Sequence, residues 1–529
     1  MPIAGRSSSL RRVSRLFRIA RDADAAGMSS DEAVEITRER ERAAVSRRTF
    51  IGGMAAASAL VMTRRVTAAP RVNVGDVAIV GAGLAGLQCA HDLGVAGVSA
   101  TIYEAGARVG GRVASLRGVF PGQVAERGGE LIDNLHKTML GWVGRLGLTR
   151  EDVNKVEGDV VYHFDGARVP EATIVDEYRV FVDAMRDDLR ASSGGPTADA
   201  FNLADQQLDQ TSLADYLRTR GCGRYAAKAI EEAYVAEYGL EASAQSALGF
   251  LLFIHADRRS RFTPFGIFSD ERFHVVEGND RIATGIAGLL PRQPELGMRL
   301  EAVRKTAAGR IELTLRTGTR SVVRTHDRVV LAVPFSVLRR VQLDASLALP
   351  AWKRLAIDQL GYGDNAKMMV GFNGPVWAET GGSGASYSDL PNHQATWETN
   401  PSLATSSRAV LTDYAGGVRG KTLDPSKVQL EAGKFVTDLD KVFPGAAAAA
   451  TKVAGKYVAH LEHWPSNPLS RGSYTAYRPG QFTTIAGNEG KPVGNLYFAG
   501  EHTNSFYEWQ GFMEGGLLSG ITAAADILK

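Results

Sequence analysis

Gly81, Gly83 and Gly86 have the spacing that lets a backbone come close to a phosphate. In a Gly-x-Gly-x-x-Gly run, the first glycine permits a tight turn and the second lets the chain approach a pyrophosphate. The third allows a helix to pack closely on a strand. Ala85 falls at the start of that helix, where free N–H groups and a positive dipole end favour phosphates. Glu104 follows about twenty residues later, where a carboxylate accepts ribose hydroxyls. The chemistry that this pattern indicates is the binding of a dinucleotide.

Two short strands and one helix must hold these residues in place. The apolar run Val77–Val80 predicts a buried strand, and residues 84–95 have a helical pattern. A second strand, Ser99–Tyr103, leads into Glu104. Strand, glycines, helix, strand and acid together predict a Rossmann-like unit. The glycines alone would also fit a turn in some other parallel sheet.

The loop after Glu104 narrows the choice of dinucleotide. Residues 104–112 read Glu-Ala-Gly-Ala-Arg-Val-Gly-Gly-Arg and resemble the flavin amine oxidase family. In that family the loop runs beside the pyrophosphate and isoalloxazine of FAD, and residues 125–130 resemble its segment under the flavin ring. The resemblance assigns Arg112 and Gly129 to FAD binding. Without the resemblance, the first segment would be interpreted as an arginine-rich surface turn.

Segments near the middle and the end of the chain resemble the same FAD site. Residues 495–503 predict a strand that ends at a glycine and an acid, and the last helix begins close to Gly515-Gly516. The N-terminus of that helix would stabilise negative charge on a reduced flavin. By resemblance, the strand with Val303 meets the adenine and the acid holds the ribityl chain. The cofactor residues that these segments add are Val303, Gly500, Glu501 and Met513.

The resemblance also supplies the residues at the reacting end of the cofactor. Lys367, on a strand predicted within residues 363–372, matches a family lysine that reaches flavin N5 through a water. Tyr474 and Phe512 match an aromatic cage that leads an amine to the flavin, although several family members have Tyr at the second position. Trp397 and Trp509 are candidate walls of the substrate cavity. The alternatives are an edge-strand lysine with its head in water and a tryptophan that belongs to the core.

The family chemistry implies oxidative deamination of a primary or secondary amine to an imine, with dioxygen reduced to hydrogen peroxide. Ser473 stands where covalently flavinylated members carry cysteine, so we expect noncovalent FAD. Amino-acid oxidases of the superfamily hold the substrate carboxylate with an Arg that follows the glycine-rich segment. Here residues 128–133 contain no Arg, and this favours amines over amino acids.

Four other functions stay open at this stage. An L-amino acid oxidase would need an Arg from elsewhere in the chain. A polyamine oxidase could place a second ammonium against Glu130 or Glu398. A cytochrome-linked amine dehydrogenase would share the fold but use another electron acceptor, and a flavin-binding protein without turnover would need no intact site.

The predicted fold class is α/β, with a discontinuous Rossmann-like FAD-binding domain and an inserted α+β substrate-binding domain. At 529 residues the chain is too long for one compact domain. The ten histidines are scattered, so we expect no metal site. The predicted segments are residues 71–149, 271–347 and 466–529 for FAD, and residues 150–270 and 348–465 for the substrate.

Residues 1–70 predict an N-terminal extension with an export signal. They hold 13 of the 61 basic residues and 7 of the 58 acidic ones, so the basic character belongs to this end and nothing suggests nucleic acid as a partner. Arg47-Arg48 precedes a mildly apolar run, residues 51–62, and then small residues, which resembles a twin-arginine signal. We therefore expect a periplasmic or secreted protein. The expected partners are a small-molecule amine, dioxygen and the twin-arginine export machinery, with a homodimer as a candidate assembly.

Overall fold

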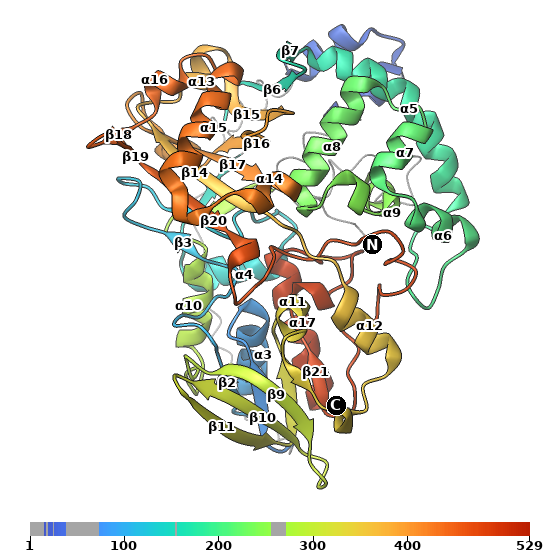
Figure 1. The fold of residues 1–529 in the computed structure, drawn as a ribbon, viewed down its shortest axis with the longest axis vertical. Coiled ribbons are helices and arrows are strands. Elements are labelled where there is room, and N and C mark those ends of the chain that lie inside the picture. Colours follow the sequence, from blue (N-terminus) through green and yellow to red (C-terminus); the bar gives the residue numbers. More distant parts are fainter. Residues whose placement is uncertain (1–14, 17–18, 25, 39–73, 154–155, 255–270) are drawn as a thin grey trace, which may run out of the picture.

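The computed structural model describes six stretches of the chain, and Figure 1 shows them in two parts. A parallel sheet with its helices lies in the lower half, and a larger sheet lies beside a group of helices in the upper half. None of the described helices is both long enough and apolar enough to cross a membrane. The described residues are 15–16, 19–24, 26–38, 74–153, 156–254 and 271–529.

A four-stranded parallel sheet forms the centre of the lower part. Its strands come from three distant regions of the sequence, which agrees with the discontinuous Rossmann-like fold that the sequence predicts. Strand β1 is buried along its whole length because helices and loops cover both faces, and this explains its continuous apolar run. The strand order is β2 (Thr101–Tyr103), β1 (Val77–Val80), β12 (Arg328–Leu331) and β21 (Leu496–Phe498).

Two helices from opposite ends of the chain pack against each other beside this sheet (Figure 1). They are α3 (Leu84–Val95) and α17 (Met513–Leu528). A Cβ atom on Gly520 of α17 would collide with the backbone oxygen of Ala85 and would lie 3.0 Å from the amide nitrogen of Cys89. The close approach of the two helices therefore depends on glycine at this position.

Cys89 and Cys222 are both free thiols.

A second four-stranded sheet flanks the parallel one (Figure 1). Strands β9, β10 and β11 are antiparallel, and β13 joins β9 in parallel. The remaining elements of this part are short connectors or surface helices. The bounds are β9 (Arg299–Lys305), β10 (Ile311–Thr317), β11 (Arg320–His326), β13 (Gln342–Leu343), β3 (Ser115–Leu116), β4 (Ala125–Glu126), α4 (Lys137–Arg145), α10 (Asp280–Gly288), α11 (Phe335–Leu338) and α12 (Ala351–Gln359).

The upper part contains a seven-stranded sheet (Figure 1). Strands β14 and β17 are fully buried along their length. Helix α15 packs on β14 and β20, and helix α8 (Arg224–Tyr238) packs on β17, β16, β15 and β6. The strand order is β20 (Ala459–His463), β14 (Ala366–Phe372), β17 (Ala409–Ala415), β16 (Ala395–Glu398), β15 (Gly382–Ser388), β6 (Asp159–Phe164) and β7 (Ala167–Val169). The flanking helices and hairpin are α13 (Val376–Glu379), α14 (Gly417–Thr422), α15 (Val428–Val442), α16 (Ala446–Ala449), β18 (Lys452–Val453) and β19 (Lys456–Tyr457).

Five helices lie beside the seven-stranded sheet and complete the predicted substrate-binding part (Figure 1). Helix α9 is apolar throughout and lies within the core, as its sequence predicts. A small antiparallel ladder of β5 (Arg150–Asp152) and β8 (Phe273–Val275) joins the start and the end of this region. The five helices are α5 (Glu171–Ala191), α6 (Leu203–Gln210), α7 (Leu213–Thr219), α8 (Arg224–Tyr238) and α9 (Ala247–Ile254).

Part of the N-terminal extension packs on α5. We call residues 15–16, 19–24 and 26–38 the N-terminal segment; Figure 1 shows it in blue beside α5 and β7. Leu16 and Ile19 are completely buried there. Arg179 of α5 donates hydrogen bonds to the carboxylate of Asp24 at 2.5 Å and to the hydroxyl of Ser30 at 3.2 Å. This segment therefore belongs to the packed core. Arg47-Arg48 and the apolar run after them lie outside the described residues.

Candidate functional site

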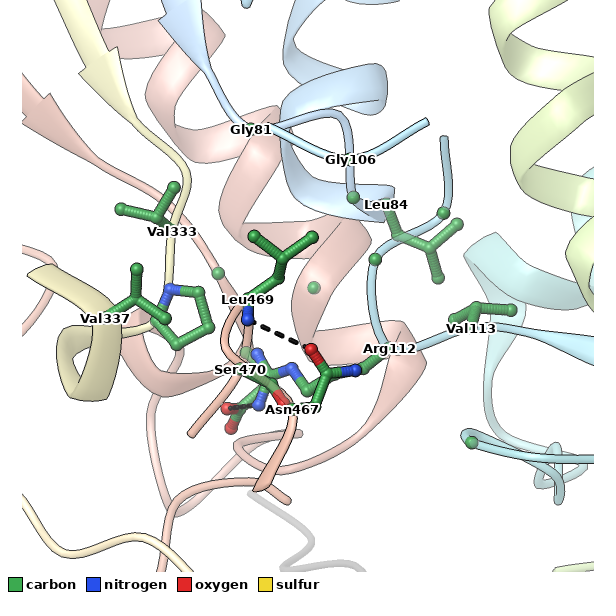
Figure 2. A pocket seen from close by; sticks show the side chains of 18 of the residues that line it. Gly81, Leu84, Gly106, Arg112, Val113, Val333, Val337, Asn467, Leu469 and Ser470 are labelled. Carbon is green, nitrogen blue, oxygen red and sulfur yellow. Dashed lines mark hydrogen bonds and ion pairs between the residues drawn. The ribbon is translucent and has the colours of Figure 1, made fainter. Parts of the chain in front are cut away.

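A cavity of about 1060 Å³ lies between the parallel sheet and the seven-stranded sheet. Its wall comes from segments far apart in the sequence. Figure 2 shows Leu84, Val333 and Leu469 around it, with Gly81 at the end of β1 beside them. The cavity is large and lined by both polar and apolar groups, which suits a cofactor together with a small substrate.

The glycine turn before α3 forms one stretch of the cavity wall. Gly83 is the N-cap of α3, no side chain caps that helix, and a Cβ on Gly83 would meet no protein atom within 4 Å. The free N–H groups of the helix therefore face open space, which is the arrangement a pyrophosphate requires. Gly81, Gly83 and Ala85 line the cavity. Gly86 does not, because it packs against the backbone oxygen of Gly81, as the motif predicts.

Glu104 directly follows the last residue of β2 and also lines the cavity. Its carboxylate accepts hydrogen bonds from the backbone N–H of Ala82 at 2.7 Å and of Gly106 at 2.6 Å. These bonds fix the carboxylate in the cavity wall, where the sequence places a ribose partner. Val303, the predicted adenine neighbour, is buried in β9 and is not part of the wall. Leu300 and Glu301 line the cavity from the same strand.

The N-terminus of α17 forms a neighbouring stretch of the wall, where a Cβ on Gly516 would lie 3.8 Å from Cβ of Leu84 at the start of α3. Phe512 is its N-cap without a side-chain cap, and Phe512, Met513 and Gly516 line the cavity. Gly129 packs so closely that a Cβ would lie 2.8 Å from Cγ and Sδ of Met513. Two uncapped helix N-termini, of α3 and α17, therefore border one cavity, and both favour negative charge on a ligand.

Arg112 and Glu501 form an ion pair in the cavity wall. Nη1 of Arg112 donates to Oε1 of Glu501 at 2.8 Å and to the backbone oxygen of Ser473 at 2.7 Å. The other carboxylate oxygen, Oε2 of Glu501, is buried and has no hydrogen-bond partner among the described residues. Gly500 lines the cavity beside it. A buried acceptor without a donor fits a hydroxyl-bearing ligand chain.

Lys367 lies on β14, in the wall of the cavity and 4% exposed. Its ammonium donates to Oε2 of Glu130 at 2.6 Å and to the backbone oxygens of Gly128 at 2.9 Å and Glu126 at 3.1 Å. Strand β14 lies between β20 and β17, so the alternative of an edge-strand lysine with its head in water is wrong. Antiparallel pairing places Tyr414 of β17 opposite Lys367.

The aromatic side chains that line the cavity with Lys367 include Trp397, Tyr414, Tyr474 and Phe512. The hydroxyl of Tyr414 donates to that of Tyr474 at 3.1 Å, and the hydroxyl of Tyr474 donates to the backbone oxygen of Glu237. Nε1 of Trp397 donates to Oε1 of Glu130 at 2.9 Å. The sequence did not indicate Tyr414, because its place in the wall follows from the pairing of β14 with β17.

Two further candidates lie behind the wall. Trp509 does not line the cavity; its ring packs edge-on against His136, with ring centroids 4.3 Å apart, and against Phe512. Burial lowers the pKa of His136 to about 3, so the imidazole is a neutral spacer. Glu398 also lies outside the wall, where its Oε2 accepts a hydrogen bond from Nε1 of Trp377 at 3.2 Å.

A family model for flavin containing amine oxidoreductases matches residues 84–528. The chain belongs to this family. It is an FAD-dependent amine oxidoreductase, and the two helix N-termini, Glu104 and the Arg112–Glu501 pair are the groups that would hold FAD. When bound, FAD supplies the two-electron chemistry, while the protein orients the substrate and tunes the flavin.

Individual relatives are similar to this chain over most of its length. An L-amino-acid oxidase from Pseudechis australis is 23% identical over 467 residues, which are 86% of this chain and 87% of that protein. The protein YobN from Bacillus subtilis is 25% identical over 85% of this chain and 94% of its own. Among solved structures, putrescine oxidase bound to putrescine and cyclohexylamine oxidase from Brevibacterium oxydans are each 22% identical. Each has a TM-score of 0.70 and covers 86% of this chain and 98% of its own.

Proposed function

We propose that this enzyme oxidatively deaminates a primary or secondary amine that carries no carboxylate. The amine loses one C–H and one N–H bond as it becomes an imine. Water then hydrolyses the imine to an aldehyde or ketone plus ammonia or an amine. Dioxygen takes the two electrons and two protons and leaves as hydrogen peroxide. FAD, which we expect to be held without a covalent bond, would supply the two-electron chemistry between the amine and dioxygen.

The observation that carries this proposal is the composition of the wall around Lys367. Residues 128–133, the glycine-rich segment after which an amino-acid oxidase would carry its carboxylate-binding Arg, contain no Arg, and Leu131 of this segment lines the cavity. The ammonium of Lys367 is already paired with Glu130. Two arginines that line the cavity are paired as well, Arg112 with Glu501 and Arg127 with Glu462. Aromatic rings guide and orient a neutral amine, whereas a substrate carboxylate would find no bidentate partner there.

The second candidate is an L-amino acid oxidase, and the names of several similar proteins favour it. Anaerobic mixing of the oxidised holoenzyme with matched pairs separates the two, for instance phenethylamine against L-phenylalanine, with cyclohexylamine and putrescine alongside. We expect the amines to bleach the flavin absorbance at least tenfold faster than the amino acids. Faster bleaching by the amino acids would replace the proposal by the alternative, and no bleaching by any compound would refute both.

The polyamine alternative depends on a carboxylate that is open to a second ammonium. Glu398 is not in the wall, and both oxygens of Glu130 already accept hydrogen bonds, from Lys367 and Trp397. These contacts weigh against a second ammonium at either position. A rate for putrescine well above that for monoamines of equal length would reverse this preference.

Noncovalent binding, the electron acceptor and export complete the proposal. The hydroxyl of Ser473 is engaged with Oδ1 of Asn365 at 2.5 Å, and a serine cannot form the thioether of flavinylated relatives. We expect denaturation to release all FAD into the supernatant.

Rapid oxidation of reduced enzyme by air would exclude a cytochrome-linked dehydrogenase. The twin-arginine signal at Arg47-Arg48 predicts that R47K/R48K keeps the enzyme in the cytoplasm, while the parent chain reaches the periplasm.

A further inference from the structure

Lys367 has a carboxylate partner that the family resemblance did not indicate. Within the described residues, its ammonium forms one ion pair, with Oε2 of Glu130 at 2.6 Å, and both side chains are 6% exposed. The other two acceptors are backbone oxygens of Gly128 and Glu126. An ammonium has three N–H donors, so these three acceptors saturate it and fix its position. A water that links Lys367 to a flavin must share one of these N–H groups.

Glu130 connects two domains through this contact. It follows Gly129 in the loop that packs on Met513, whereas Lys367 lies on β14 and Trp397 on β16 of the seven-stranded sheet. One oxygen of Glu130 accepts from Lys367 and the other from Nε1 of Trp397 at 2.9 Å. A single buried carboxylate thus ties the flavin-side loop to both the expected catalytic lysine and a wall of the substrate cavity.

We propose that Glu130 is a positioning residue that acts through Lys367. The backbone oxygens are fixed by the loop, so Glu130 is the partner whose charge and side-chain conformation decide where the ammonium stands. Charge-assisted hydrogen bonds are about twice as strong as neutral ones, so loss of the carboxylate charge weakens the strongest of the three contacts. Displacement of a reacting group by about 1 Å can slow a reaction about 100-fold. This inference rests on the proposed function only in assigning Lys367 to the flavin.

A double-mutant cycle tests the inference without knowledge of the substrate. The variants are Glu130→Gln, Lys367→Met and the double variant, each purified with FAD and reduced photochemically. Mixing with air-saturated buffer gives the rate constant of flavin reoxidation by dioxygen. We expect Glu130→Gln to slow reoxidation about 10- to 100-fold and Lys367→Met to slow it at least as much. If Glu130 acts through Lys367, the double variant is no slower than Lys367→Met alone.

A spectroscopic readout and a matched control complete the design. Glu130→Gln should shift the visible flavin absorption of the oxidised holoenzyme, and the shift should vanish in the Lys367→Met background. Glu398→Gln is the control, because Glu398 is also a buried carboxylate bonded to a tryptophan indole but does not contact Lys367. It should leave the reoxidation rate and the spectrum unchanged.

The outcomes distinguish the positioning role of Glu130 from the proposed role of Lys367 at the flavin. A Glu130→Gln rate within about twofold of the parent, or a double variant slowed by the product of both single effects, would overturn the positioning role. A parental rate in Lys367→Met would instead remove the proposed role of the lysine itself. Should Glu130→Gln fail to retain FAD, the same cycle is run with Glu130→Asp, which keeps the charge but shortens its reach.

Discussion

Nη1 of Arg112 lies 2.8 Å from Oε1 of Glu501 and so joins segments that are 389 residues apart in the sequence. The pair stands between the loop that follows β2 and the strand end before α17. The ion pair therefore holds these two distant segments together. The second oxygen of Glu501 is buried without a partner among the described residues, so it remains available as an acceptor for the cofactor.

Glu501→Gln should weaken FAD binding. The amide keeps the shape of the carboxylate but loses the charge that strengthens its bonds to Arg112 and to a ligand hydroxyl, and a hydrogen bond to a charged group contributes about 1.5–3 kcal/mol. We expect the Kd for FAD to rise about tenfold or more. Titration of the apoenzyme with FAD, followed by quenching of flavin fluorescence, measures this change. An unchanged Kd would show that Oε2 meets no donor of the cofactor.

Gly83→Ala should impair FAD binding, whereas Gly81→Ala should lower the stability of the fold. Gly83 has φ −74°, which any residue adopts, and open space around its missing Cβ, so Gly83→Ala should fold but impede the pyrophosphate. Gly81 has φ +107° and its Cβ would collide with the backbone oxygen of Ala332, so Gly81→Ala should destabilise the sheet itself. Thermal unfolding of the apoproteins together with FAD content distinguishes the two. Equal melting temperatures of the two apoproteins would contradict the assignment.

Tyr474→Ala should lower kcat/KM for the preferred amine far more than Tyr474→Phe. The phenylalanine keeps the aromatic wall and loses only the hydroxyl contacts to Tyr414 and to the backbone of Glu237. The alanine removes the ring that orients the amine, and a misplaced substrate costs about 100-fold. Steady-state oxygen uptake measures both variants. A similar loss in both would mean that the hydroxyl, not the ring, has the main role.

Ile19→Asp tests whether the N-terminal segment is part of the folded enzyme. Ile19 is completely buried against the core that includes α5, and an unpaired charge at such a position costs several kcal/mol. We expect the melting temperature to fall by several degrees while FAD remains bound, because the cavity lies elsewhere. Glu32→Ala, at an exposed position of the same segment, should have no effect. An unaltered melting temperature in Ile19→Asp would mean that the segment does not dock in solution.

The local motifs correctly predicted the glycine turn and the elements on either side of it. Residues 77–104 form the expected strand, turn, helix and strand, although β2 begins at Thr101 rather than Ser99. The glycines and the hydrophobic pattern that specify this unit all lie within about thirty consecutive residues, so the sequence of that stretch is enough to predict it. Resemblance to a family placed Lys367, Tyr474 and Phe512 in one wall, and the cavity contains all three.

The remaining features of the site, the positions of Tyr414, Glu130 and Trp509, depend on long-range contacts that no local sequence pattern encodes. Tyr414 enters the wall because β17 pairs with β14 in a register that places it opposite Lys367. Glu130 meets Lys367 and Trp397 only because the flavin-side loop lies against interior strands of the seven-stranded sheet, β14 and β16. Trp509 had the right residue type and position in the sequence, yet the turn before α17 directs its ring toward His136.

Glu398→Gln should change how stability depends on pH. Burial, with a further contribution from the nearby Glu151, raises the pKa of Glu398 from its ordinary 4.5 to about 7. Between these values the folded state holds a proton that the unfolded state has lost, so folding stability falls as the pH rises from about 4.5 to about 7. The loss from this one group is at most about 3 kcal/mol.

Glutamine does not titrate, so the variant escapes this loss. Relative to the parent enzyme, Glu398→Gln should therefore gain a few degrees in melting temperature at pH 8 and gain less at pH 5. Glu379→Gln, an exposed position two residues after Trp377, serves as the control and should show the same difference at both pH values. Differential scanning calorimetry of the apoproteins separates this effect from FAD binding. A Glu398→Gln difference that is the same at pH 5 and pH 8 would mean that Glu398 is already ionised in the folded protein near pH 5, despite its burial beside Trp377.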